Sequence, residues 1–214
     1  MKQALIISLK VLAVDVPLLL LLGTAIGWIL AKKKFRGREI VSLLVLLPVA
    51  LPPSVIGLYL LLFIGHFPLF RDLGLLFSFP AAALAALIPS LPIMIQGARS
   101  GFASVPVELE DAARTLGDGE WRVFRRITLA LSRRPLIAGL TLASARTLGD
   151  FGVTLMIAGN IPGSTQTLPL YIFSRMESLD FAKANIAALL LAGIGIISLA
   201  LVKSMESNKH ERLA

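Results

Sequence analysis

Apolar residues occur in long runs separated by short polar segments, a pattern typical of a chain that crosses a membrane several times. A helix needs about 20 apolar residues to cross the hydrocarbon core, because that core is ~30 Å thick and a helix rises ~1.5 Å per residue. Five runs are long enough, and each predicts one membrane span: residues 4–31, 40–64, 76–97, 135–158 and 184–202. A shorter apolar run, residues 166–174, predicts a helix near the outer surface that does not span.

The positive charges between these runs indicate the direction of the spans. Residues 32–39 contain five basic side chains and residues 99–134 contain seven arginines, whereas the alternate segments contain few. Lys and Arg concentrate in the cytoplasmic loops of membrane proteins, so we expect the N-terminus outside and the C-terminus in the cytoplasm. The first run lacks a cleavage site followed by a polar segment, so we expect it to be a retained anchor and not a removed signal peptide.

The composition agrees with a membrane protein. Of the 214 residues, 56% are apolar and 16% are charged, whereas about 25% of a soluble domain is charged. We therefore expect one all-α domain over residues 1–214, a polytopic membrane helix bundle of about five transmembrane helices. The net charge of +8 belongs largely to the cytoplasmic segments, and we expect lipid and no nucleic acid as a partner. The absence of cysteine excludes disulfide scaffolds, iron–sulfur clusters and thiolate zinc sites.

The loop of residues 99–134 is the only long polar segment, and its pattern predicts two short helices. Four residues at helical spacing form one face of the first helix: Leu109, Ala112, Ala113 and Leu116. Acidic side chains crowd the first turns, where the helix dipole favours them, and Gly117 is placed to end the helix. Periodicity alone leaves two hypotheses open. The hairpin either lies on the lipid surface or docks into a groove of a partner protein.

The spacing within this loop carries a family resemblance. The sequence reads Asp111-Ala112-Ala113, three residues, Gly117, nine residues, and then Ile-Thr-Leu-Ala from Ile127. This resembles the coupling segment of binding-protein-dependent ABC importer permeases, which has E-A-A, three residues, Gly, nine residues and I-x-L-P. Asp111 departs from the usual Glu but keeps the charge. Ala130 replaces the usual Pro, which puts the end of the second helix in doubt but not the first helix.

Four stretches, one of them within this loop, resemble the permease subunit of molybdate importers: residues 51–62, 108–124, 145–163 and 165–173. The resemblance implies a type I permease fold in the cytoplasmic (inner) membrane. It also implies a homodimer, a separate ATP-hydrolysing subunit that binds ATP and Mg, and an external oxyanion-binding protein. The implied function is import of molybdate or tungstate. A sulfate or other oxyanion permease is the alternative, and a membrane scaffold that only recruits a partner is a rival of another class.

No enzymatic motif is present in the sequence. It contains no G-x-x-x-x-G-K-[ST], H-E-x-x-H or G-x-S-x-G segment, so neither the phosphate-binding loop of an ATPase nor these hydrolase sites are expected. His66 is expected in a short outer loop and His210 in the polar tail, where each is more easily explained as a solvated side chain than as a general base. We expect no catalytic residue, no metal site and no cofactor in this chain.

Three groups of residues are candidates for function. The resemblance assigns coupling to the ATPase to seven residues of the loop: Glu108, Glu110, Asp111, Ala112, Ala113, Arg114 and Gly117. The translocation pathway has six candidates: Ser144, Arg146, Thr147, Asp150, Pro52 and Pro53. The outer-face segment has another six: Gly159, Asn160, Pro162, Gly163, Thr165 and Gln166.

Arg146 and Asp150 also have a purely structural interpretation. They lie four residues apart on one helix face and can pair there, which lowers the cost of burying two charges in a membrane. The functional interpretation is that Arg146 lowers the barrier for a passing anion. The prolines likewise indicate either packing kinks or a broken helix beside a pathway.

Overall fold

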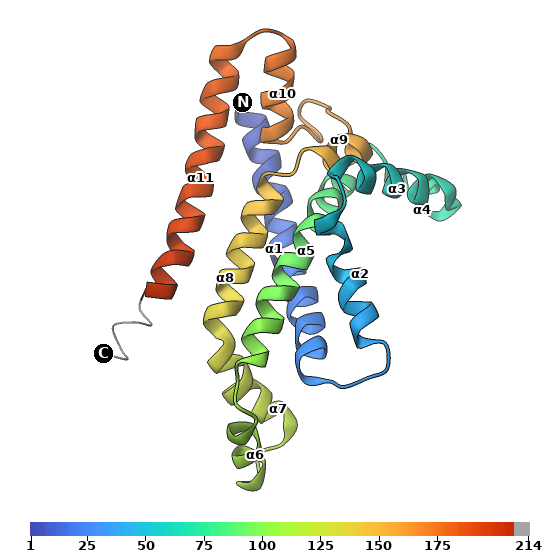
Figure 1. The fold of residues 1–214 in the computed structure, drawn as a ribbon. Coiled ribbons are helices and arrows are strands. Elements are labelled where there is room, and N and C mark those ends of the chain that lie inside the picture. Colours follow the sequence, from blue (N-terminus) through green and yellow to red (C-terminus); the bar gives the residue numbers. More distant parts are fainter. Residues whose placement is uncertain (208–214) are drawn as a thin grey trace.

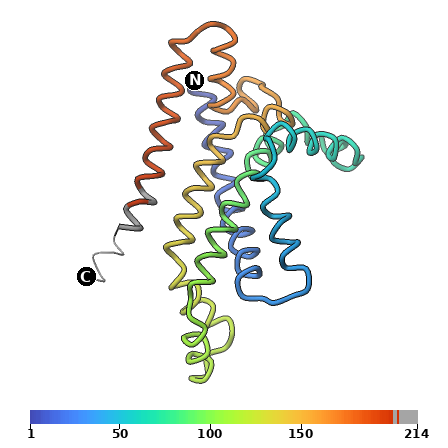
Figure 2. Tube along the Cα trace, viewed as in Figure 1, coloured from blue at the N-terminus to red at the C-terminus, as the bar shows by residue number. Residues whose placement is uncertain are grey.

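The computed structural model describes residues 1–207, except for the side chains of residues 201–202 and 204–207, and no β-strand occurs in that range. The expected cytoplasmic tail, residues 208–214, lies outside the described residues. The described chain is an elongated bundle of helices with a small hairpin at one end (Figures 1 and 2). An all-α bundle is the predicted fold class.

Three helices form the centre of the bundle: α1 (Lys2–Lys32), α5 (Phe79–Ala103) and α8 (Leu129–Leu148). Helix α5 packs against both others, and six of its 14 buried residues are alanines. Small residues let the backbones approach closely in a membrane. At Gly27 of α1, for example, an added Cβ would lie 2.5 Å from the Cβ of Ala98 of α5. The close α1–α5 contact therefore depends on small side chains on both helices.

The remaining long helix, α11 (Phe181–Ser207), packs against α8 and against the short helix α10 (Leu168–Glu177). Figure 1 places α10 and the N-terminus at one end of the bundle, and the hairpin that contains α6 and α7 at the other. Helix α10 has 10 residues and is therefore only ~15 Å long. It is too short to span, as the sequence predicts for residues 166–174.

By length and composition, α1, α5 and α11 could cross a membrane, and up to four spans are possible if one bent helix pair is counted as a span. That pair is α2 (Arg38–Ala50) and α3 (Pro53–His66), which meet at an angle of 112°. The predicted span over residues 40–64 is therefore broken near its middle, as one of the two interpretations of its prolines expects, and its crossing of the membrane stays a prediction. The break follows from Pro52 and Pro53, because proline lacks an amide donor and disfavours helix in the residue before it. Leu51 is extended there, with ψ 142°.

A second predicted span, residues 135–158, is also interrupted. Helix α8 begins earlier than predicted, ends at Leu148, and is followed after three residues by α9 (Gly152–Ala158). We call residues 149–151 the elbow. Helices α3 and α9 pack against each other, and an added Cβ on Gly152 would lie 2.9 Å from the Cβ of Pro53. The two helix breaks are therefore neighbours, and α3 with the short α4 (Pro68–Asp72) extends sideways from the bundle there (Figure 1).

Candidate functional site

The hairpin between α5 and α8 is the most distinctive feature of the chain. It consists of α6 (Val107–Thr115), α7 (Glu120–Val123) and a π-helical turn, η1 (Phe124–Thr128), that leads directly into α8. The Cα trace shows this segment projecting beyond the ends of the long helices (Figure 2). π-Helical turns within helices often occur at functional positions. The hairpin is thus a protruding element whose two ends continue into α5 and α8.

Gly117 ends α6 as the sequence predicts. Its φ is +90°, the left-handed region that favours glycine. The amide of Gly117 donates to the carbonyl of Arg114 at 3.0 Å, and the amide of Asp118 donates to the carbonyl of Ala113 at 3.1 Å. This pair of hydrogen bonds is the Schellman arrangement, which satisfies two carbonyls at the end of a helix. The cap gives the exposed end of α6 a defined shape.

We expect Gly117→Ala to loosen the end of α6, because a left-handed conformation costs a residue with a Cβ about 1–2 kcal/mol. An added Cβ at Gly117 would meet nothing within 4 Å, so any effect of the substitution comes from backbone strain and not from a steric clash. Gly119→Ala is the matched control, since Gly119 is equally unobstructed but has φ −69°. Limited trypsin digestion after Arg114 measures the opening: Gly117→Ala should be cleaved about 5- to 30-fold faster, and Gly119→Ala at the wild-type rate. Equal rates for the two variants would exclude the cap.

The exposed face of α6 differs in part from the predicted face. Leu109, Ala112 and Leu116 are exposed, and Leu116 has 89% of its surface accessible. Ala113 is only 8% exposed, because α7 and η1 fold back onto that side of α6. The assignment of Ala113 to coupling with the ATPase stays a prediction, and the burial of Ala113 within its own chain does not favour it. Ala113 packs inside the hairpin, whereas Ala112 remains on the outer face.

Arg114 links the two helices of the hairpin on its surface. Its guanidinium donates to both carboxylate oxygens of Glu120, at 2.7 and 3.2 Å, and to Asp111 at 2.6 Å. The hydrogen bond to Glu120, and to a smaller extent the one to Asp111, raises the pKa of Arg114 above its ordinary value. The hydrogen bond from Arg114 lowers the pKa of Glu120. Exposed pairs of this kind add little stability. Glu108 is exposed nearby, so the predicted Glu108, Asp111 and Arg114 all remain on the surface of the hairpin.

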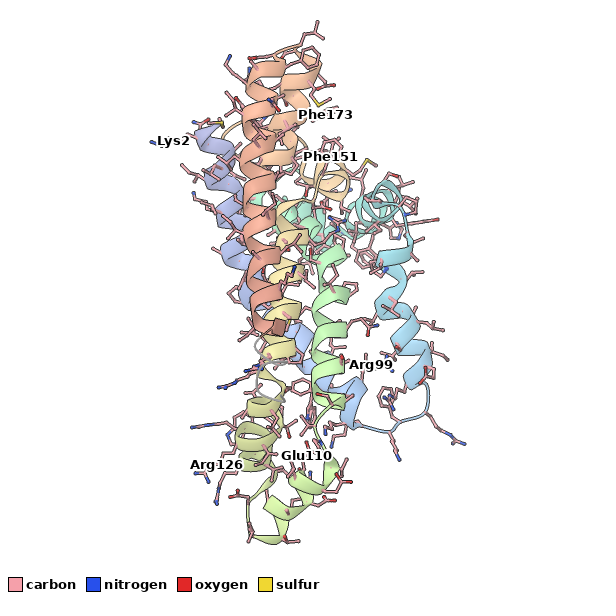
Figure 3. All side chains as sticks on the ribbon, turned by 60° about the vertical axis from the view of Figure 1, so that its left-hand side comes forward. Lys2, Arg99, Glu110, Arg126, Phe151 and Phe173 are labelled. Atoms are coloured by element: carbon pink, nitrogen blue, oxygen red, sulfur yellow. The ribbon has the colours of Figure 1, made fainter. Side chains whose placement is uncertain are left out.

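Glu110, in contrast, is buried and holds the hairpin against the bundle (Figure 3). Its carboxylate lies 3.0 Å from Lys32 Nζ at the end of α1, and accepts a hydrogen bond of 2.6 Å from the Thr128 hydroxyl in η1. Lys32 also donates to the carbonyl of Val105 at 3.2 Å. We call Lys32, Glu110 and Thr128 the buried strut. Glu110 therefore faces its own chain and not the exposed surface.

Aromatic side chains support the same attachment. The rings of Trp28 of α1 and Phe124 of η1 meet edge to face at 5.9 Å, and Phe102 at the end of α5 lies 6.1 Å from Phe124. Sequence analysis did not identify Lys32, Thr128 or these rings as parts of the site. Lys32 was one of several loop charges, and the residues that meet here are far apart in the sequence.

Four of the six predicted pathway residues lie in or just before the elbow, and two of them, Arg146 and Asp150, bond to each other. Arg146 Nη1 lies 3.2 Å from Asp150 Oδ1, and the other oxygen of Asp150 accepts from the amide and hydroxyl of Thr154 at 3.0 and 2.8 Å. The Thr147 hydroxyl donates to Ser90 of α5 at 3.0 Å. Asp150 thus joins the end of α8 to the start of α9. The pairing that the structural interpretation of Arg146 and Asp150 expects is present.

Two more side chains in or near the elbow also have partners within the protein. The Ser144 hydroxyl donates to the carbonyl of Leu140 in its own helix at 2.7 Å. Phe151 stacks obliquely on Phe173 of α10, with ring centres 5.1 Å apart, and Figure 3 shows the two side chains at the same end of the bundle. Pro52 and Pro53 are exposed at the neighbouring break.

A cavity of about 1000 Å³ opens elsewhere, between α2, α5 and the first half of α8. We call it the α2–α5–α8 cavity. It is lined by none of the six predicted pathway residues, but by polar side chains such as Gln96 and Ser100 and by Arg133 and Arg134. Sequence analysis counted these two arginines only as positive charges of a loop. The structure places them instead in the wall of this cavity.

The predicted outer-face segment is a compact loop between α9 and α10. Asn160 and Gln166 form hydrogen bonds with each other at 2.9 Å and with Ser174 of α10 at 2.7 and 3.3 Å. The Thr165 hydroxyl accepts from the amide of Ile161 at 3.1 Å. Thr165 and Gln166 are buried, whereas residues 161–164, which include Pro162 and Gly163, are exposed. Gly159, with φ +68°, begins the loop. This end of the bundle therefore presents a short, internally braced projection.

Comparisons with known proteins agree with these features. Residues 23–209 match the family described as binding-protein-dependent transport system inner membrane component. The molybdenum transport system permease protein ModB of Escherichia coli (strain K12) is 38% identical over 210 residues, covering 94% of this chain and 91% of that protein. The sulfate transport system permease protein CysW of Synechococcus elongatus is 32% identical over 213 residues, covering 97% of this chain and 74% of that protein.

The same arrangement of helices is found in a solved structure. The crystal structure of an amino acid ABC transporter with histidines aligns with a TM-score of 0.65 and 17% sequence identity, and the alignment covers 96% of this chain and 92% of that chain. At this identity the likeness concerns the fold alone. The permease fold predicted from the sequence is confirmed, and the chain belongs to the family of inner membrane components of binding-protein-dependent transport systems.

Proposed function

We propose that this chain is the permease subunit of an ATP-driven molybdate importer and that two copies enclose the translocation pathway across the inner membrane. The relatives named as molybdenum permeases, at 36–38% identity over most of the chain, support this substrate. The observation that carries the proposal is the protruding hairpin, with its glycine-capped helix and its exposed apolar face of Leu109, Ala112 and Leu116. A protruding hairpin of this shape fits into a groove of a partner protein whose conformation changes during ATP hydrolysis.

The partner at the hairpin is an ATP-hydrolysing subunit, which binds ATP and Mg. The buried strut joins α6 to α1 and η1, and the aromatic contacts join η1 to α1 and α5, so a displacement of the hairpin is transmitted to the bundle. This end of the chain is cytoplasmic in the proposal. An oxyanion-binding protein delivers substrate at the other end, where residues 161–164 project.

The second copy completes the pathway, because one chain of this size encloses little space by itself. Gly193 and Gly195 of α11 have no neighbour within 4 Å of an added Cβ, so this helix offers small residues for close approach by another helix. A twofold axis is the commonest symmetry for such pairs.

Reconstitution of the chain with its ATPase and binding protein in vesicles tests the function. We expect ATP-dependent uptake of radiolabelled molybdate, with tungstate as an effective competitor and sulfate as a weaker one. If sulfate is taken up in preference to molybdate, the chain is a sulfate permease, the alternative that relatives at 31–32% identity represent. If no oxyanion is taken up with any partner, the chain is a scaffold and the proposal is wrong.

A further inference from the structure

The α2–α5–α8 cavity has an unbalanced charge. Arg133 and Arg134 line it, and no Asp or Glu does. Among the other arginines at this end of the bundle, Arg114 and Arg122 pair with carboxylates, and Arg99 of α5 (labelled in Figure 3) donates to Ser42 of α2 at 2.6 Å. Arg125 and Arg126 of η1 form no ion pair within the described residues, but they do not line the cavity. Within residues 1–207, neither Arg133 nor Arg134 forms an ion pair. Two guanidinium groups are thus available to an anion.

The uncharged part of the lining is suited to the same ligand. Gln96 and Ser100 of α5, with Ser104 just after its end, contribute an amide and two hydroxyls to the wall. Guanidinium groups have planar arrays of donors that match the oxygens of tetrahedral oxyanions, and amide and hydroxyl donors supplement them. A volume of about 1000 Å³ holds such an anion with many of its waters, since one water occupies about 30 Å³. The anion therefore need not be stripped of its hydration to enter.

The position of the cavity connects it to the hairpin. Its walls are the end of α5 and the start of α8, and these are the two segments from which the hairpin emerges. At the back of the cavity α5 and α8 touch, where an added Cβ on Gly97 would lie 2.8 Å from the Cα of Gly139. Any movement of the hairpin that separates or closes its two stems changes the shape of this cavity.

We propose that Arg133 and Arg134, with Gln96 and Ser100, form a binding site for the transported tetrahedral oxyanion at the mouth of the pathway on the hairpin side. The inference rests on the proposed function, and it assigns substrate contact to residues other than the elbow. The arginines hold the dianion by electrostatic attraction and release it into the compartment that contains the ATPase. Because the site is wide and hydrated, the interaction favours passage over tight retention.

The test uses the natural absence of cysteine from the chain. Ser100→Cys places a single thiol in the wall of the cavity, where Ser100 is exposed. In the complete importer, we compare its reaction with anionic sulfonatoethyl and cationic trimethylammonioethyl methanethiosulfonate, each normalised to the rate with a free thiol. The anionic reagent should react at least ~10-fold faster, because a positively lined cleft raises the local concentration of anions by that order. Molybdate should slow the reaction, and choline should not.

The arginines are tested in the same background. Arg133→Gln/Arg134→Gln should abolish the preference for the anionic reagent and the protection by molybdate, and should reduce molybdate uptake at least ~10-fold. Arg133→Lys/Arg134→Lys should keep the charge preference and so separates lost charge from misfolding. Arg36→Gln, in the loop between α1 and α2 and outside the cavity, is the control for a general loss of positive charge. It should leave the preference for the anionic reagent, the protection by molybdate and the molybdate uptake unchanged.

The outcomes separate the two proposals. If the wild-type importer takes up molybdate but Ser100→Cys shows neither charge preference nor protection, the site is wrong and the function stands. Wild-type uptake by the double Gln variant also overturns the site, because the arginines then serve only as positive charges at the membrane surface. If the wild-type importer transports no oxyanion, the proposed function fails independently of this site.

Discussion

Replacing Glu110 with Ala is expected to lower the stability of the permease by about 3–5 kcal/mol, the usual cost of removing one partner of a buried ion pair. The change leaves Lys32, whose side chain is 15% exposed, without its carboxylate, and leaves the buried Thr128 hydroxyl without its acceptor. Thermal unfolding of the purified chain in detergent measures the loss. Glu108→Ala is the matched control, because Glu108 lies on the same helix and is exposed; it should change the midpoint little.

A double substitution distinguishes a lost pair from a general intolerance of the position. Lys32→Met/Glu110→Leu removes both charges and should recover much of the stability that Glu110→Ala loses, because well-packed apolar residues often replace a buried pair at little cost. If the double variant loses at least as much stability as Lys32→Met and Glu110→Leu lose in sum, the pairing of Lys32 with Glu110 contributes nothing specific. Equal midpoints for Glu110→Ala and Glu108→Ala would contradict the burial of Glu110.

The buried strut also shows where sequence analysis reaches its limit. Lys32 and Glu110 are 78 residues apart, and nothing local to either residue indicates the other. The acidic residues of α6 could be recognised as helix-terminal charges, but not which of them faces inward. Ala113 is a similar case. Helical spacing places it beside Ala112 on a small-residue face, but the fold of α7 decides that Ala113 is covered and Ala112 is not.

Features set by local chemistry were predicted more successfully. Gly117 ends α6 because a left-handed residue is needed there, and the short apolar run before Glu177 forms a helix too short to span. The two helix breaks differ in this respect. The prolines at residues 52 and 53 were visible as possible breaks, although their 112° bend was not predicted. The elbow contains no proline, so its sequence resembles the interior of a span. Its hydrogen bonds from Thr154 to Asp150 became apparent only in the structure.

The second large effect concerns the exposed face of α6, which we expect to bind the ATPase. Leu116→Asp should reduce co-purification of the ATPase at least ~10-fold and abolish uptake, because the change replaces an apolar contact worth about 1.5–3 kcal/mol with a buried charge. The permease itself should keep its thermal midpoint, since Leu116 is 89% exposed and supports nothing in its own chain. Leu73→Asp is the matched control: Leu73 is 71% exposed and lies in the turn between α4 and α5, away from the hairpin.

Two neighbouring alanines make this prediction sharper. Ala112→Trp adds bulk on the outer face, so it should act like Leu116→Asp, with normal stability and little bound ATPase. Ala113→Trp adds the same bulk inside the hairpin and should lower the thermal midpoint of the permease itself, because overpacking a buried position costs about 1–3 kcal/mol. A cysteine at position 116 should crosslink to the ATPase, and one at position 73 should not. If Leu116→Asp and Ala112→Trp both transport normally and no crosslink forms, the apolar face of α6 lies on the lipid surface, and the hairpin does not transmit the work of ATP hydrolysis.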